Sequence, residues 1–290
     1  MKKRNLVLSV MATCLVSCFL LSGCNGQKQI DSETVKTVKV EEQAHLQDDT
    51  VSPTCQITID YSYLAKSDAA DSIVQRINRT IQAHILGKEY TRMNPEVAVD
   101  SFKNTYINNY RKDVNEFYQE DIKNGTPKDE LPTWYNYEYG LTTYFSEGKE
   151  GILNFIAETF EYTGGAHPNS WNKWMNFEKN TGKLLALKDV FMAGSEKPIS
   201  DMLLEELITE MATRLEDSSI TSLEGLQNAG ILNSTNMYVP DNFLLEKEKV
   251  SFLYNKYDIA PYAVGIITLS LPYTCLLYTS PSPRDPKTSR

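Results

Sequence analysis

The residues best suited to chemistry gather in and just after one short loop, Tyr162–Pro168, which reads Tyr-Thr-Gly-Gly-Ala-His-Pro. Paired glycines permit positive φ angles and the close approach of a ligand or another backbone, and the proline fixes the exit. Loops held between rigid strands often carry binding residues. The same pattern is also typical of a plain strand connection that needs special dihedral angles. We take as the candidate binding loop Gly164, Gly165, His167, Trp171 and Trp174.

A search for catalytic motifs around this loop finds none. A zinc hydrolase needs three protein ligands, whereas His45, His84 and His167 are far apart in the sequence and show no ligand spacing. No nucleophile elbow, Walker loop or dinucleotide fingerprint is present. The sequence therefore predicts no catalytic residue, no metal and no cofactor.

One enzymatic alternative stays open at this stage. Glu138, Glu158 and Glu161 lie among aromatic residues close to the loop in sequence. Two carboxylates on either side of a glycosidic bond can hydrolyse it. The alternative function is therefore a glycan-active hydrolase that uses acidic residues near the Gly-Gly-Ala-His loop.

Alternating patterns predict the elements that must position the loop. Strands are expected over 55–63, 134–146, 151–162 and 171–177, with a short return over 183–187, a hairpin over 243–254 and a last strand over 264–271. Apolar residues at helical spacing predict helices over 68–86 and 95–123 and another that Pro198 opens. The fold class is α+β: a mixed α/β domain with an antiparallel, aromatic-rich sheet packed by two or three helices.

The N-terminus has the features of a secretory leader. A basic start precedes an apolar run over 6–21, which is short for a membrane-spanning helix. The run ends in Leu-Ser-Gly-Cys, which resembles the bacterial lipobox. The resemblance implies a signal peptide over 1–23 and a Cys24 that carries fatty acyl chains such as palmitate. It implies an extracytoplasmic protein of the cell envelope, anchored to a membrane through Cys24; which membrane leaflet holds it stays open.

The composition and net charge limit the kinds of partner that the protein is expected to bind. Removing the three basic residues of the leader lowers the net charge from −9 to −12. Nucleic acids and anionic lipids need a basic surface, so nucleic-acid binding is not expected. Residues 24–53 are polar, which predicts a flexible tether between the lipid anchor and the domain.

The C-terminal residues 275–290 break the composition abruptly and resemble a translated adapter sequence. We interpret them as a non-native tail, and for that reason we expect no Cys55–Cys275 disulfide.

Three motifs, taken in order, carry a family resemblance: the Tyr162–Pro168 loop, the run from Asn176 to Phe191, and the segment Tyr254–Tyr262. Together they resemble the extracytoplasmic domains of RsiV-type anti-sigma factors, which sense lysozyme, and of PdaC-type peptidoglycan deacetylases. The resemblance divides the domain into a PdaC-like half over 54–162 and an RsiV-like half over 163–274, with the loop as a hinge between them.

The resemblance also has departures. The chain shows no cytoplasmic sigma-binding segment and no deacetylase domain, so we expect the non-catalytic module alone on a lipid anchor. The RsiV resemblance implies a lysozyme-like envelope protein as the partner, and the PdaC resemblance implies a peptidoglycan fragment. A purely structural envelope module is the third interpretation.

Overall fold

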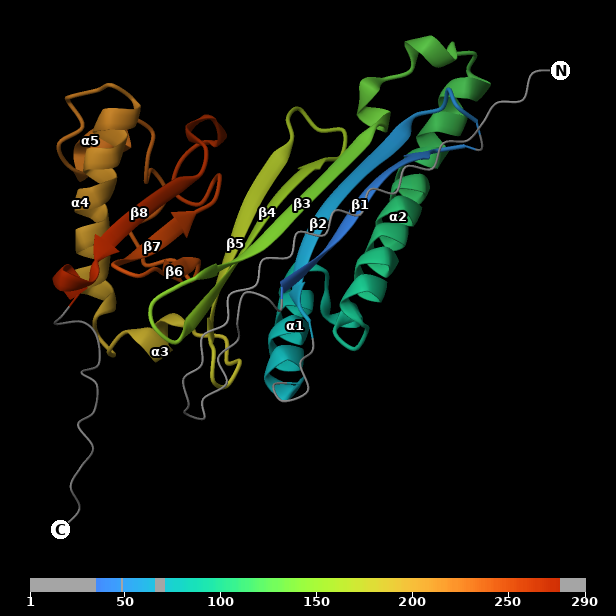
Figure 1. The fold of residues 1–290 in the computed structure, drawn as a ribbon. Coiled ribbons are helices and arrows are strands. Elements are labelled where there is room, and N and C mark those ends of the chain that lie inside the picture. The colour runs from blue at the N-terminus through green and yellow to red at the C-terminus, as the bar shows by residue number, and fades with distance from the viewer. Residues whose placement is uncertain (1–34, 48, 66–70, 277–290) are drawn as a thin grey trace, which may run out of the picture.

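The computed structural model describes residues 35–47, 49–65 and 71–276 (Figure 1). The expected leader, the lipobox with Cys24 and the expected helix cap at Ser67-Asp68 lie outside the described residues. So does all of the expected tail beyond Leu276. Within the described part of the chain, none of the helices is long and apolar enough to cross a membrane.

The larger unit is a five-stranded sheet in the order β1-β2-β3-β4-β5. All neighbours are antiparallel except β2 and β3, which run parallel because the chain crosses over through two helices between them. The mixed α/β prediction is confirmed, with one parallel pair inside the sheet. The strands are β1 (Val35–His45), β2 (Thr54–Leu64), β3 (Tyr137–Glu147), β4 (Ile152–Tyr162) and β5 (Asn169–Glu178).

Helices α1 (Asp71–Ile85) and α2 (Pro95–Lys123) cover one face of this sheet (Figure 1). Helix α1 buries Ile77 and Ile81 of the expected stripe together with Val74, and Ile73 and Ile85 of that stripe are half-buried against the same core. The Asn94 side chain caps α2 by accepting a hydrogen bond from the backbone of Glu96. Short 3-10 turns connect these elements at Lys88–Tyr90, Lys128–Glu130 and Thr133–Tyr135.

The smaller unit is a three-stranded antiparallel sheet with its own core. Helix α4 (Glu196–Arg214) packs along this sheet and buries Ile199, Leu203, Leu207 and Met211 (Figure 1). The expected return over 183–187 forms only an isolated bridge, between Phe177 and Leu184. The elements are α3 (Leu187–Val190), α4, α5 (Leu223–Asn228), β6 (Phe243–Leu245), β7 (Lys249–Tyr254) and β8 (Ile267–Pro272), with 3-10 turns at Tyr262–Val264 and Tyr273–Leu276.

The tether predicted over 24–53 is wrong for residues 35–45, which form β1. This strand pairs with β2 along its whole length, from Val35–Leu64 to His45–Thr54. It is the edge strand of the sheet, and its Val38 and Val40 pack on the core while Lys36, Lys39 and Glu41 stay exposed. Charged residues are common on edge strands because they discourage further pairing, so a polar composition concealed the strand.

The division predicted at 162/163 does not separate two halves. Strands β4 and β5 pair from Ile152–Glu178 to Glu161–Asn169, so residues 163–168 form the turn of a hairpin inside one sheet. The two hydrophobic cores divide further along the chain, because the first ends at Phe177 and the second begins at Phe191. The loop is therefore not a hinge between halves.

Asparagine side chains join the two sheets along the free edge of β5. The backbone N–H groups of Asn172 and Trp174 donate to the side-chain oxygens of Asn255 and Asn242, each over 2.7 Å. Both amide nitrogens donate back to the Asn172 carbonyl oxygen, at 3.1 and 2.8 Å. We call Asn172, Asn176, Asn242 and Asn255 the asparagine seam.

Asn176 makes the innermost link of the seam. Its amide nitrogen donates to the Phe243 carbonyl oxygen and its amide oxygen accepts from the Leu245 N–H, both over 2.8 Å. The side chain is 1% exposed, so water cannot replace either bond. The Asn176 side chain thus makes the two hydrogen bonds to β6 that a residue of a neighbouring strand would otherwise make.

We expect Asn176→Ala to lower the free energy of unfolding by about 2–4 kcal/mol, because it leaves two buried backbone groups without partners. Urea unfolding followed by circular dichroism measures the change. The control is Asn180→Ala, at an exposed position with no side-chain hydrogen bond in the described structure, where we expect a change within about 0.5 kcal/mol. Equal losses in the two variants would contradict a structural role for the seam.

Candidate functional site

The Gly-Gly-Ala-His loop docks onto the segment Tyr254–Tyr262, so two of the sequence motifs meet in space. The His167 Nε2 lies 3.1 Å from the Tyr257 hydroxyl, and its ring stacks on Tyr262 with 3.9 Å between centroids. The Tyr262 hydroxyl donates to the Pro168 carbonyl oxygen over 2.8 Å. The loop is thereby fixed to the smaller unit.

A lysine completes this junction. The Lys256 ammonium lies 4.2 Å from the centroid of the Tyr262 ring and donates to the Ser170 hydroxyl over 3.1 Å. Tyr257 has a positive φ of 71°, which is uncommon for a residue with a side chain, and it is 60% exposed. His167 is therefore part of an exposed aromatic stack. Within the described ranges no group of three metal-ligating side chains occurs.

The two glycines of the loop differ. Gly164 has a φ of 84°, and a β-carbon there would lie 2.4 Å from the Trp134 carbonyl oxygen. Gly165 has no positive φ, and the nearest atom to a β-carbon there would be 3.8 Å away. Of these two positions, only 164 has a backbone conformation that requires glycine.

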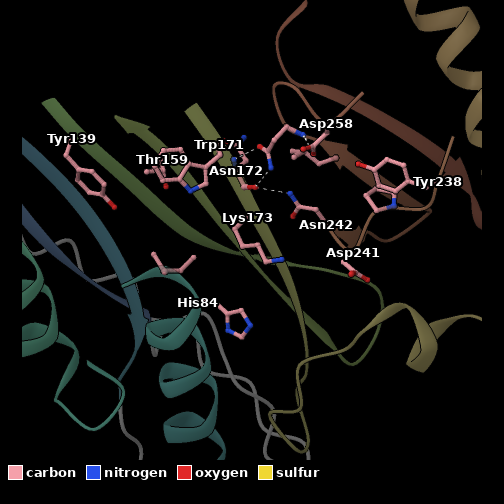
Figure 2. Close-up of a pocket in the computed structure, with 14 residues that line it drawn as sticks. His84, Tyr139, Thr159, Trp171, Asn172, Lys173, Tyr238, Asp241, Asn242 and Asp258 are labelled. Atoms are coloured by element: carbon pink, nitrogen blue, oxygen red, sulfur yellow. Dashed lines mark hydrogen bonds between the residues drawn. The ribbon is translucent and has the colours of Figure 1, made fainter. Parts of the chain in front are cut away.

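A cleft of about 370 Å³ opens beside the seam, on the helix-covered side of β5 (Figure 2). We call it the seam cleft. Its volume falls within the range of small-molecule sites, roughly 300–1,000 Å³. Figure 2 shows side chains from α1, from β5 and from the segment that flanks β6 and β7 around this space. They include His84, Trp171, Lys173, Tyr238, Asp241 and Asp258.

The polar groups of the seam cleft are of two kinds. Its three asparagines, Asn172, Asn242 and Asn255, are hydrogen-bonded within the seam. The side chains of Lys173 and Asp241, in contrast, make no ion pair or hydrogen bond to any described residue. The cleft therefore leaves charged side chains free, together with uncharged groups such as the Thr159 hydroxyl and the Asn172 side-chain amide.

Three further groups line the cleft. Asp258 accepts a hydrogen bond from the Asn255 backbone N–H over 2.7 Å. The His84 Nδ1 lies 2.8 Å from the Thr80 carbonyl oxygen, so it donates there and leaves Nε2 free. Burial, with a smaller effect of the Asp258 charge, raises the pKa of Tyr238, whose hydroxyl therefore stays protonated at neutral pH.

The two tryptophans of the candidate loop lie on opposite faces of β5. Trp171 shares a face with Lys173 and lines the seam cleft, whereas Trp174 lines a second groove of about 560 Å³ on the other face. We call it the acidic groove, because four glutamates and two lysines line it. Those side chains are Glu147, Glu158, Glu246, Glu248, Lys247 and Lys249. The residues of the candidate loop therefore do not form one site.

The acids proposed for a hydrolase are also kept apart. Glu161 accepts a hydrogen bond from Tyr106 of α2 over 3.0 Å, and Glu158 accepts one from Tyr144 over 3.3 Å on the opposite face of the sheet. Glu138 lies four positions along β3 from the partner of Glu158, about 13 Å away. Catalytic carboxylates of glycosidases stand about 5–9.5 Å apart. These three residues do not make such a pair.

Sequence reasoning missed most of the seam cleft. Tyr238 and Asp241 lie in an irregular segment with no periodicity, and only the fold brings them to β5. A signal for two of the others was present, because Asn255 and Asp258 belong to the Tyr254–Tyr262 motif.

Comparison with protein families finds two matches. Residues 50–170 match the family model described as deacetylase PdaC. Residues 188–274 match the model described as protein of unknown function (DUF3298). The expected resemblance is confirmed, and the gap between the matches falls where the hydrophobic cores divide. The chain carries PdaC-like and DUF3298-like regions, whose specific role is unknown.

Two solved structures are similar to the chain. A DUF3298 family member from Bacteroides fragilis is 29% identical, with a TM-score of 0.78, over 88% of this chain and 96% of that one. A DUF3298 family protein from Pseudomonas aeruginosa is 16% identical, with a TM-score of 0.56, over 85% and 94% of the two chains, and shows a shared fold. No curated protein matches the chain.

We expect Gly164→Ala to lower the free energy of unfolding by about 1–3 kcal/mol, because alanine disfavours this positive φ and its β-carbon would clash with the Trp134 backbone. Gly165→Ala is the matched control one residue away, and we expect a change within about 0.5 kcal/mol. Thermal unfolding of both variants measures the difference. A larger loss at Gly165 than at Gly164 would contradict this assignment.

Proposed function

We propose that this protein is an extracytoplasmic lipoprotein whose domain binds a peptidoglycan fragment in the seam cleft without catalysing a reaction. The observation that carries the proposal is the cleft itself. It combines aromatic side chains, among them Trp171 and Tyr238, with free charged groups in a space of about 370 Å³. Clefts that bind small molecules typically pair aromatic walls with a few well-placed polar groups.

The membrane anchor is part of the proposal and rests on the sequence alone. A basic start, an apolar run and Leu-Ser-Gly-Cys fall in register before residue 24. Acylation of Cys24 would hold the domain at the surface of a membrane outside the cytoplasm, which is where peptidoglycan fragments occur. The polar residues between Cys24 and β1 would link the two.

A binding role agrees better with the geometry than hydrolysis does. The three acids that motivated the hydrolase alternative lie on two faces of the sheet and along its length. Asp258, in the cleft, accepts a hydrogen bond from the backbone N–H of Asn255, which holds its carboxyl group in place. Such a group is suited to holding a cationic or hydroxyl group of a ligand.

We expect Trp171→Ala to weaken binding of a disaccharide muropeptide at least about tenfold, because truncating a central aromatic contact costs more than about 1 kcal/mol. Titration calorimetry on the full chain in detergent measures the affinity. Trp174→Ala is the matched control from the opposite face of the same strand, and it should leave this affinity unchanged. Binding that is lost equally in both variants, or absent from the wild type, would contradict the proposal.

The acidic groove supports a second candidate, a basic envelope protein such as a lysozyme-like enzyme. Exposed Tyr144 and half-buried Trp174 lie there among four glutamates. Charge complementarity speeds association, and aromatic anchors supply affinity. A pull-down with lysozyme distinguishes the candidates, because Trp174→Ala should reduce its capture and Trp171→Ala should not. No enrichment of lysozyme by the wild type would eliminate this candidate.

We expect Cys24→Ser to abolish incorporation of labelled fatty acid and to move the protein out of the membrane fraction, because the thiol is the site of acylation. Cell fractionation with fatty-acid labelling measures both. Cys18→Ser, inside the apolar run of the leader, is the matched control and should leave both unchanged. A Cys24→Ser protein that stays acylated and membrane-bound would contradict the anchor.

A further inference from the structure

We infer that the seam cleft recognises a zwitterionic peptide, with one wall for a carboxylate and the other for an ammonium group. This inference rests on the proposed function and names the part of the fragment that is bound: the peptide rather than the sugar. Three features of the cleft carry it.

The wall made by β5 is the cationic one. Lys173 is half-buried on β5, and its ammonium group makes no ion pair or hydrogen bond to any described residue. A half-buried ammonium without a partner is a strong site for a carboxylate, because the pair forms where water is partly excluded.

The opposite wall is anionic. Asp241 and Asp258 approach from the segments before β6 and after β7 (Figure 2). Asp241 has no partner among the described residues, and the Asn255 N–H orients Asp258. No ion pair joins Lys173 to either aspartate within 4.0 Å. A ligand that carries both charges would neutralise the two walls at once.

Between these walls two side-chain amides are already engaged. The amides of Asn242 and Asn255 each both donate and accept within the seam, and Asn172 uses its backbone there. The free charged groups favour a zwitterionic peptide, which carries an ammonium and a carboxylate, over a neutral sugar, which carries neither. Trp171 and Tyr238 supply apolar surface for the side chains of a peptide.

Titration calorimetry on the full chain in detergent tests the inference with Nα-acetyl-L-Lys-D-Ala-D-Ala, which has one ammonium and one carboxylate. The Nα,Nε-diacetyl form lacks the ammonium, and the C-terminal amide lacks the carboxylate. We expect each derivative to bind the wild type about tenfold more weakly, since each loses one charge-assisted contact. This comparison needs no protein variant.

Two variants assign the walls. Lys173→Gln should bind the free acid and its amide equally. Asp241→Asn, which leaves Asp258 in the anionic wall, should reduce the preference for the free amine over its acetylated form. Lys112→Gln, at an exposed position of α2, is the control and should keep both preferences. A variant that weakens all peptides alike while both preferences remain would overturn the assignment.

Tri-N-acetylchitotriose and a disaccharide muropeptide distinguish this inference from the proposed function. Binding of the glycan without binding of the peptide overturns the inference and leaves the proposed function intact. Equal affinity for all three peptides also overturns the inference. If neither the muropeptide nor the peptides bind, the inference and the proposed function fail together.

Discussion

The structure depends on how the free edge of β5 is satisfied. An edge strand presents backbone groups that would otherwise pair with water or with another chain. Here the side-chain amides of Asn242 and Asn255 bind the outward groups of Asn172 and Trp174. In the other direction, the side chain of Asn176 on β5 binds the backbone groups of Phe243 and Leu245 in β6. An amide side chain carries the same donor and acceptor as a peptide group, so it can join two sheets that do not continue one another as strands.

Both grooves of the molecule follow from this seam. Asn172 lines the seam cleft on one side of β5 and the acidic groove on the other. Two further contacts hold the seam at its ends. His167 and Tyr262 stack at one end, and the Lys149 N–H donates to the Leu245 carbonyl oxygen over 2.9 Å at the other. The clefts are therefore shaped by a fixed relation between the units and not by a single loop.

Much of the fold could be predicted from alternation and helical spacing. The strands around Ile57, Tyr139 and Phe155, and the helix with Ile77 and Ile81, were predicted because each buries one face and so leaves a periodic signal. Strand β1 was missed because it is a charged edge. The boundary between the units was misplaced because a glycine-rich hairpin turn and a linker between domains have the same composition.

The sequence by itself determined the class of the fold, the family resemblance, the special status of the loop that contains Gly164, and the expectation of a lipid anchor. These properties depend on patterns among residues that are close together in the sequence. Only the tertiary structure decided that Trp171 and Trp174 face different grooves and that His167 belongs to a stacked junction. It alone brought Lys173 to the same cleft as Asp241, because their proximity depends on the seam, where contacts join residues about 70 positions apart in the chain.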